Sequence, residues 1–542
     1  MESFDYIIVG AGTAGCVLAN RLTADGKTRV LLLEAGGSDR TLWIQLPIGY
    51  GRTYFDSRVN WMYDTEAVPG LGGRSSYWPR GKVIGGSGSI NAMVHVRGQR
   101  GDFDDWAAAG NPGWAWNDVL PWFIRSEDHD HGASEWHGAT GPQHVTDISN
   151  VAHPLCQSFI KAGEALNFTA SPDLNGPQSE GVGIYQINTS KGRRASTANA
   201  YLRPALRRGT IVLRTRAQAT RILFEGLRAV GVEYRCGNET IQARARAEVI
   251  VSGGSINSPQ LLQLSGIGDA ALLASLGITP RVDARAVGRN LQDHLAVSYF
   301  YKTSVPTLND ELRPLTGQIW AGLRYLLNRS GPLSMSVNQG GGFVRSGPDA
   351  SRPDLQLYFS PVSYTHSPLS ERKLLKPDPF SAFLLSFNAC RPTSRGHLHI
   401  ASADPFAHPA IHPNYLATDH DVTQALRGIH LLRQLAAAPP LAGIIEHELV
   451  PGSHLSSDAD LLNDFRQRAD TVYHPTSTCM MGPDPATSVV DARLRVHGVH
   501  GLRVVDTSIF PNITSGNTNA PTVMVAEKAA AMILEDSAAD NR

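Results

Sequence analysis

The sequence of 542 residues has little cysteine, no net charge and no long apolar run. Its five cysteines (Cys16, Cys156, Cys236, Cys390 and Cys479) are scattered, odd in number and without metal-ligand spacing. We therefore expect a reducing compartment and no disulfide framework. Lysine plus arginine and aspartate plus glutamate number 49 each, so no overall field would recruit nucleic acid.

The longest apolar runs fall short of the roughly 20 residues that a transmembrane helix needs, and no signal-peptide pattern precedes the first apolar segment. We expect a cytoplasmic protein without a transmembrane segment. A peripheral contact with the inner membrane stays open, as does the oligomeric state. The chain is too long for one hydrophobic core, so we expect two domains, or one large domain with a substantial insertion. Hydrophobic residues make up 42% of the chain, which is typical of a globular enzyme.

The N-terminal segment has the pattern of a dinucleotide-binding βαβ unit. An apolar strand leads into the glycine turn at residues 10–15, a helix follows, and a second strand ends at Glu34. In such a unit Gly10 permits the tight turn, Gly12 lets the backbone approach a pyrophosphate, and Gly15 allows close helix packing. The acid at the end of the second strand binds ribose hydroxyls. FAD and NAD both fit this unit, so the turn alone does not choose between them.

Later segments resemble the signatures of the glucose–methanol–choline (GMC) oxidoreductase family. Residues 81–91 (GKVIGGSGSIN) resemble the first signature, and residues 254–268 match the second. His474-Pro475 and residues 517–522 (NTNAPT) resemble the family's active-site segments. The motifs occur in the family's order along essentially the whole chain. The resemblance looks closest to the choline-dehydrogenase-like branch, which includes bacterial dehydrogenases of aliphatic alcohols.

The resemblance implies an α/β fold (α+β overall) in which a Rossmann-like FAD-binding domain is interleaved with a substrate domain. The substrate domain would be built on an antiparallel sheet with helices. The FAD-binding domain would comprise residues 1–155, 196–305 and 471–542, and the substrate domain residues 156–195 and 306–470.

FAD is the cofactor that the resemblance implies, and Ile90 bears on how it is held. Relatives that attach the flavin covalently carry a histidine at this position, so we expect non-covalent binding. The residues expected to contact FAD are Gly10, Gly12, Thr13, Ala14, Gly15, Glu34, Ala35, Gly81, Val83, Gly86, Ser87, Asn91, Ala92, Met93, Val94, Ala219, Asp506, Thr507, Asn519, Ala520 and Thr522.

Two further histidine-containing features do not change this picture. His95 stands where the family has tyrosine or phenylalanine, and we favour a tolerated aromatic replacement over a titrating group near the flavin. Residues 127–131 (EDHDH), with His137 nearby, have metal-ligand types but lack a helical or hairpin frame. We expect a solvated loop there and no metal site. The alternation of polar and apolar residues at 397–400 predicts a half-solvated strand.

Alcohol oxidation needs a base for the hydroxyl proton and a polar group that holds the developing alkoxide. The resemblance gives these roles to His474 and Asn519. We therefore predict an FAD-dependent dehydrogenase that oxidises a small, neutral primary alcohol and passes electrons to a quinone or another carrier. An oxidase that uses oxygen and a hydroxynitrile lyase with a redox-silent flavin are the alternatives. The sequence does not identify the alcohol.

Overall fold

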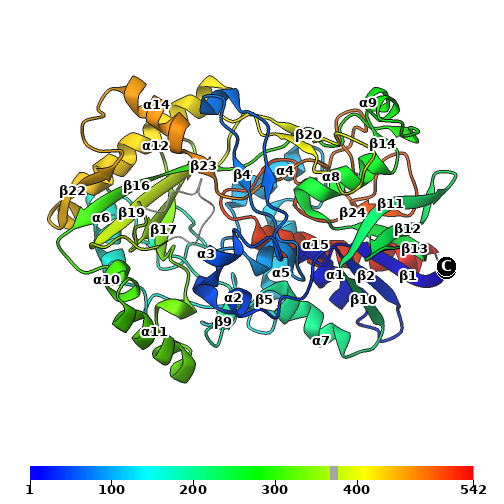
Figure 1. Ribbon diagram of the computed structural model, residues 1–542, viewed down its shortest axis with the longest axis horizontal. Helices are drawn as coiled ribbons and strands as arrows, with labels where there is room; N and C mark the ends of the chain where they lie inside the picture. Colours follow the sequence, from blue (N-terminus) through cyan, green and yellow to red (C-terminus); the bar gives the residue numbers. More distant parts are fainter. Residues whose placement is uncertain (366–375, 541–542) are drawn as a thin grey trace.

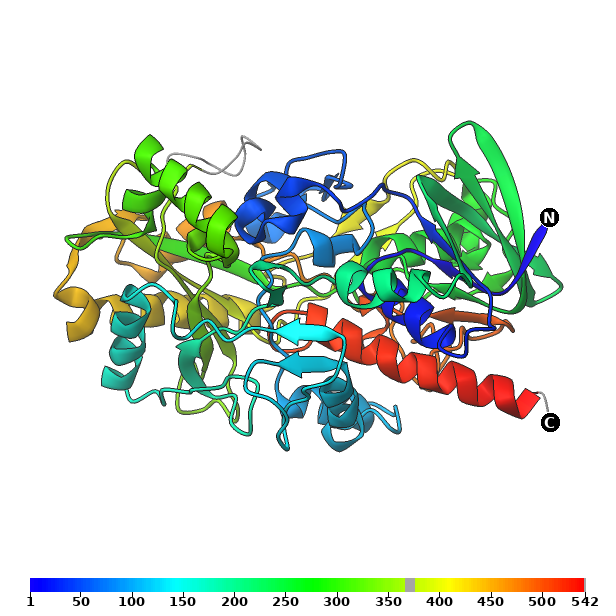
Figure 2. The same ribbon diagram turned by 90° about the horizontal axis from the view of Figure 1, so that it is seen from below.

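The computed structural model describes residues 1–365 and 376–540, which form two large sheets at opposite ends of the long axis of the molecule (Figure 1). The first sheet holds the predicted βαβ unit. β1 (Glu2–Val9) pairs in parallel with β2 (Val30–Glu34) on one side and with β13 (Glu239–Val251) on the other. The helices α1 (Thr13–Leu22) and α15 (Asn519–Asp540) pack on each other beside this sheet (Figure 2). Strands covered in this way are buried, which explains their nearly continuous apolar sequence.

The first sheet has the strand order β10-β2-β1-β13-β12-β11, and β24 also pairs with β13. The N-terminal pairs are parallel, whereas β11, β12 and β13 form an antiparallel meander. Its remaining strands are β10 (Ile211–Thr215), β11 (Ala217–Glu225), β12 (Arg228–Cys236) and β24 (Leu502–Val504).

The glycine turn after β1 has the conformation that its sequence predicts. Gly10 has a φ of 101°, and a Cβ atom there would collide with the carbonyl oxygen of Ser252. A Cβ atom at Gly15 would collide with the carbonyl oxygen of Gly10, so α1 rests directly on the end of the strand. Only glycine allows both approaches.

The second sheet is antiparallel, with the order β17-β18-β19-β16-β22 and with β23 paired to β16. Apolar side chains of these strands pack against α6 (Leu155–Ala165), α12 (Asp419–Ala437) and α14 (Asp458–Arg468) in a separate core. The strands are β16 (Leu295–Thr303), β17 (Gly340–Val344), β18 (Leu355–Ser360), β19 (Ala382–Ala389), β22 (Ile445–Val450) and β23 (Asp470–Thr471).

The predicted fold class is confirmed, because a dinucleotide-binding sheet is interleaved along the chain with an antiparallel sheet and its helices. One predicted boundary does not agree with the pairing. The predicted FAD-binding domain extends to residue 305 and so includes β16, but β16 lies in the second sheet between β19 and β22. We propose that the domain boundary lies before Leu295. None of the described helices combines the length and apolar character needed to cross a membrane.

Candidate active site

A cavity of about 970 Å³ is lined by residues of both sheets and of the loops between them. Gly10, Gly12 and Glu34 of the βαβ unit contribute to its wall, and so do His474 and Asn517 from the C-terminal part of the chain. Ligand cavities have volumes of roughly 300–1,000 Å³, so this one is at the upper end of the range. Its size and its continuous lining suit a cofactor together with a small substrate.

Most of the predicted cofactor residues line this cavity. The exceptions are Gly15, Val83 and Ala520. Gly15 supports the glycine turn from behind, as described above. Val83 is fully buried in a small apolar cluster with Ile90, and Ala520 belongs to the core around α15. These three residues contact the elements that form the wall rather than the cavity itself.

The floor of the cavity is made of backbone where the two glycine-rich segments meet. A Cβ atom at Gly86 would lie 2.7 Å from the Cα atom of Gly12, so no side chain fits between them. Gly12 is the N-cap of α1 and supplies no side-chain cap, which leaves the first N–H groups of the helix available to a ligand. A helix N-terminus of this kind binds phosphate. These residues fit the pyrophosphate of a dinucleotide.

Glu34 lies in the same wall and is buried. Its carboxylate accepts hydrogen bonds from the backbone N–H groups of Ala11 (3.0 Å) and Gly36 (2.8 Å). Burial raises the pKa of Glu34 to about 7 in spite of these two bonds. The position at the end of β2 is the one from which an acid reaches a ribose, as the sequence predicted.

His474 is held in one orientation by three polar contacts, and a fourth contact holds the ring of His294 beside it. Its backbone N–H donates to Oδ1 of Asp293 (2.8 Å), and its Nδ1 lies 3.0 Å from Nδ1 of His294. Nε2 of His294 lies 2.9 Å from the carbonyl oxygen of Cys390, and Nε2 of His474 lies 3.1 Å from Nδ2 of Asn517. The sequence predicted the position of His474, but it did not indicate the contact with His294.

These contacts assign the proton positions in both rings. A carbonyl oxygen only accepts, so Nε2 of His294 carries its proton and the Nδ1 of the neutral ring accepts. The facing Nδ1 of His474 must therefore donate. The Nε2 of His474 is left without a proton, and it accepts from the amide of Asn517. This is the nitrogen that can take a proton from a ligand.

The environment of His474 keeps its imidazole neutral. Burial is the main cause that holds the pKa of His474 well below its usual value, and repulsion from His294 and Arg80 adds to it. Burial also lowers the pKa of His294 to about 4. A neutral ring with a bare nitrogen is the form that a general base requires.

The predicted partner of His474 is wrong by two residues. The amide that contacts His474 belongs to Asn517, whereas Oδ1 of Asn519 accepts a hydrogen bond from the hydroxyl of Thr13 (3.0 Å). Asn519 is the first residue of α15, and its side chain lies against the start of α1. Both asparagines line the cavity. The motif NTNAPT contains both, so the sequence alone could not separate their positions.

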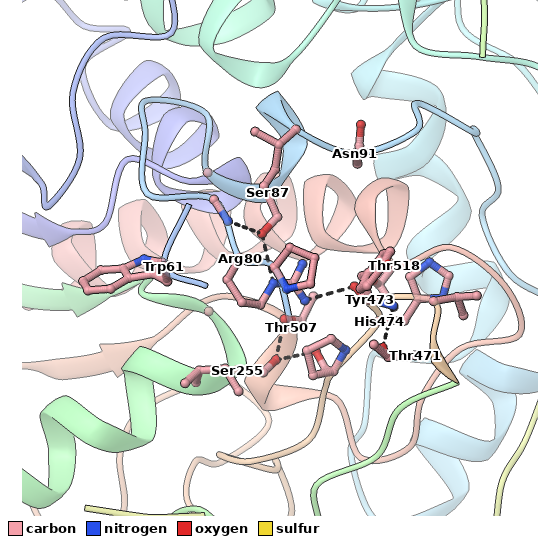
Figure 3. A pocket seen from close by; sticks show the side chains of 18 of the residues that line it. Trp61, Arg80, Ser87, Asn91, Ser255, Thr471, Tyr473, His474, Thr507 and Thr518 are labelled. Atoms are coloured by element: carbon pink, nitrogen blue, oxygen red, sulfur yellow. Dashed lines mark hydrogen bonds between the residues drawn. The ribbon is translucent and has the colours of Figure 1, made fainter. Parts of the chain in front are cut away.

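Arg80 also lines the cavity, although no motif in the sequence predicts it. Its Nε donates to the hydroxyl of Ser87 (3.2 Å) and its Nη1 to the carbonyl oxygen of Tyr473 (3.0 Å), next to His474 (Figure 3). Burial lowers the pKa of Arg80. The sequence feature that could have identified Arg80 is its position directly before the first glycine of the motif at residues 81–91.

The prediction of a solvated loop at residues 127–131 is wrong for Glu127. Glu127, in β5 (Glu127–His129), is fully buried and accepts hydrogen bonds from Arg97 (3.0 Å) and His137 (2.9 Å). His95 is 3.0 Å from the same carboxylate and does not line the cavity. The expected polar loop is a buried charge network, because two histidines and an arginine from other segments converge on one carboxylate. His95 belongs to this network rather than to the flavin environment.

The fold and the cavity together define a two-domain oxidoreductase that uses a dinucleotide cofactor. The model of the N-terminal region of the GMC oxidoreductases matches residues 4–296, and that of the C-terminal region matches residues 392–526. The chain belongs to the GMC oxidoreductase family. The predicted FAD cofactor and the predicted class, an FAD-dependent alcohol oxidoreductase, are confirmed.

Full-length relatives agree with this assignment. The chain is 43% identical to the mitochondrial choline dehydrogenase of Mus musculus, over 98% of this chain and 89% of the relative. It is 41% identical to an alcohol dehydrogenase [acceptor] of Pseudomonas putida, over 98% of this chain and 96% of the relative. The solved structure of a single-residue variant of the formate oxidase of Aspergillus oryzae RIB40 superposes with a TM-score of 0.91 at 26% identity, covering 99% of this chain and 98% of that one.

Proposed function

We propose that the protein oxidises a small, neutral primary alcohol to the aldehyde and passes the electrons to a quinone or another carrier. The observation that carries this proposal is the single cavity that joins the uncapped end of α1 to the bare Nε2 of His474. FAD, when bound, supplies the hydride acceptor. We expect Gly12, Gly86 and Glu34 to hold it without a covalent bond, since Ile90, which also lines the cavity, has no nucleophilic atom.

His474 acts as the base in this proposal. An alcohol hydroxyl that displaces the amide of Asn517 from Nε2 gives its proton to that nitrogen, while the proton on Nδ1 stays shared with His294. The displaced Nδ2 of Asn517 then donates to the alkoxide oxygen. A hydrogen-bond donor beside the oxygen on which negative charge develops lowers the barrier.

The part of the lining contributed by the second sheet favours a neutral substrate. Phe300, Tyr358, Tyr364 and Leu384 supply apolar and aromatic surface. Among the described lining residues between 296 and 470, the one acid is Asp470, and its carboxylate is hydrogen-bonded to the hydroxyl of Ser76. The described lining residues of this region therefore offer no further carboxylate that could form an ion pair with a cationic substrate.

The pair of asparagines provides the first test. Asn517→Ala removes the donor to the alkoxide, and we expect flavin reduction by the alcohol to slow about 10-fold or more while FAD content stays normal. Asn519→Ala removes a contact with α1 instead, so we expect weaker FAD binding and a smaller effect on the reduction rate. Rapid-mixing measurements of flavin bleaching without oxygen, beside the FAD-to-protein ratio, distinguish the two. The reverse pattern would overturn the assignment.

Anaerobic mixing with a panel of primary alcohols separates the remaining alternatives. Bleaching of the flavin band by aliphatic or benzylic alcohols, but not by choline, is the expected result. Rapid recovery of colour on admitting air would identify an oxidase, whereas slow recovery that a soluble quinone accelerates supports the carrier. Release of cyanide from a cyanohydrin without bleaching would identify the lyase.

We also propose that α11 (Leu315–Asn328) rests on an anionic lipid surface, where a quinone would be available. The helix carries Arg324 and no acidic residue, and it is flanked by Arg313 and Arg329, so its charge complements such a surface. A helix that exposes apolar residues, with tryptophan among them, is typical of a membrane interface. Its exposed apolar side chains are Leu315, Ile319, Trp320, Leu323, Leu326 and Leu327.

Sedimentation with phosphatidylcholine vesicles that contain phosphatidylglycerol tests this contact. We expect the wild-type holoenzyme to sediment with the vesicles and the Leu326→Glu variant to remain in solution. Leu227→Glu is the matched control, because Leu227 is also exposed but lies far from α11 in the chain. Equal sedimentation of the two variants, or self-association that Leu326→Glu abolishes, would overturn the lipid contact.

A further inference from the structure

Three histidines lie on one face of a two-stranded antiparallel sheet outside the cavity. The strands are β20 (His397–His399) and β21 (Ala410–His412), and His397 is directly opposite His412. Side chains two apart on a strand point to the same face, so His399 lies on this face too. Leu398 and Ile411 point the other way into an apolar core, which fixes the orientation of the histidines.

The three imidazole rings form a compact group. The centroids are 4.6 Å apart for His397 and His412, 5.5 Å for His399 and His412, and 5.8 Å for His397 and His399. One ring nitrogen of each lies within 4.8 Å of the corresponding nitrogens of the other two. We propose that His397, His399 and His412 bind a divalent transition-metal ion of the zinc type. This departs from the expectation, drawn from the sequence, that the protein has no metal site.

Coordination requires the three rings to approach and to turn. Zinc–nitrogen bonds of about 2.0–2.1 Å in tetrahedral geometry place ligand nitrogens roughly 3.3 Å apart, so the rings must close by up to about 1.5 Å. The rings are stacked within 16° of parallel, so they must also rotate until their lone pairs, which lie in the ring planes, point at one ion. All three histidines are partly exposed, which leaves space for this rotation. Imidazole is a ligand that suits zinc, copper and nickel, whereas magnesium and calcium prefer oxygen.

Two charged residues act on the group in opposite directions. Arg289 repels a cation there, whereas the Glu66 carboxylate acts on His399 with the opposite sign. The backbone N–H of Glu66 donates to the carbonyl oxygen of Ile411 (2.8 Å), next to His412, and its side chain is exposed. We expect Glu66 to supply the fourth ligand, because a carboxylate completes a zinc site and offsets the charge of Arg289.

The position of the group indicates a structural role. None of the three histidines lines the cavity, so the ion would not meet the alcohol. β21 leads directly to Tyr415, whose hydroxyl donates to Asp293, and Asp293 accepts the backbone N–H of His474. An ion that clips β20 to β21 would therefore stabilise the segment that supports the active-site histidine.

Zinc titration of the tag-free, FAD-loaded enzyme tests the proposal after treatment with a chelator and dialysis. We expect calorimetry with ZnCl₂ to show one ion per chain, with no competition from magnesium. Loss of an outer-shell partner weakens metal sites 10- to 100-fold, so we expect His412→Gln, which loses a direct ligand, to raise the Kd about 100-fold or more. His430→Gln is the control, because His430 is an exposed histidine on α12 that pairs with Asp458.

The FAD content of each variant reports that it has folded, so lost zinc binding in a yellow variant cannot be ascribed to misfolding. Saturable binding in the wild type and in His430→Gln, but not in His412→Gln, supports the site. No saturable binding, or equal affinity in His412→Gln, would overturn it and would show that the rings only pack against one another. Unchanged affinity in Glu66→Gln would overturn the carboxylate ligand.

Discussion

The contact between His294 and His474 allows a sharp test of the proposed role of His474 as the base. His294 does not line the cavity, so replacing it leaves the alcohol and FAD contacts in place. Phenylalanine fills the space of the ring but removes the acceptor at Nδ1. The proton on His474 is then free to occupy either nitrogen, and the tautomer with a proton on Nε2 cannot act as the base.

The expected magnitude follows from one buried hydrogen bond. The two Nδ1 atoms are 3.0 Å apart and both rings are buried. Leaving a buried donor without its acceptor costs about 1–3 kcal/mol. Because about 1.4 kcal/mol corresponds to a factor of ten in rate, His294→Phe should slow flavin reduction roughly 5- to 150-fold. His294→Asn places an amide oxygen near the position of Nδ1, so this variant should lose much less.

Anaerobic rapid mixing at saturating alcohol measures the reduction rate directly, and the flavin absorbance of the resting enzyme reports the FAD content. A positioning role predicts a lower rate constant with an unchanged apparent affinity for the alcohol, together with partial recovery in the asparagine variant. If the phenylalanine and asparagine variants lost the same activity, or if neither lost any, the tautomer argument would be refuted.

Three further predictions concern pH, cofactor binding and stability. The pKa of His474 is held well below its usual value of about 6.5, so the neutral base form is retained as the pH falls. The rate of flavin reduction should therefore stay constant down to about pH 6. A decline centred near pH 6.5 in a pH–rate profile would contradict this. Gly86→Ala should abolish FAD binding because the new methyl group meets Gly12, whereas Gly226→Ala, at a similar positive φ but in open space, should leave the FAD-to-protein ratio unchanged. Burial raises the pKa of Glu127, but Arg97 and two histidines outweigh burial and hold this pKa well below its usual value. The ionised carboxylate therefore stabilises the fold at neutral pH. This contribution is lost as the pH falls through the lowered pKa. Replacing Glu127 with glutamine leaves a buried guanidinium unpaired at a cost of about 3–5 kcal/mol, which thermal melting at pH 7 should show as a melting temperature several degrees lower, with the difference shrinking in acid.

Features that depend on neighbouring residues were predictable from the sequence. The turn at Gly10 and Gly12 and the acid at Glu34 lie within one βαβ unit, and the structure places them as expected. The segments that join the two strands and the helix are short, so they allow few other arrangements of these residues. The antiparallel sheet and its place in the chain followed from the family resemblance. The predicted boundary at residue 305 does not agree with the pairing of β16, because a strand carries no local mark of the sheet that it joins.

The sequence by itself determined the family and the cofactor, and it pointed to the histidine that we propose as the base, because each of them is marked by a continuous motif. Only the tertiary structure decided which groups surround that histidine. His294 is 180 residues from His474 along the chain, and the start of α15 decides that Asn517 rather than Asn519 reaches the ring. The buried network of Glu127 and the histidine group of β20 and β21 likewise depend on segments that meet only after folding, and no single motif contains such contacts.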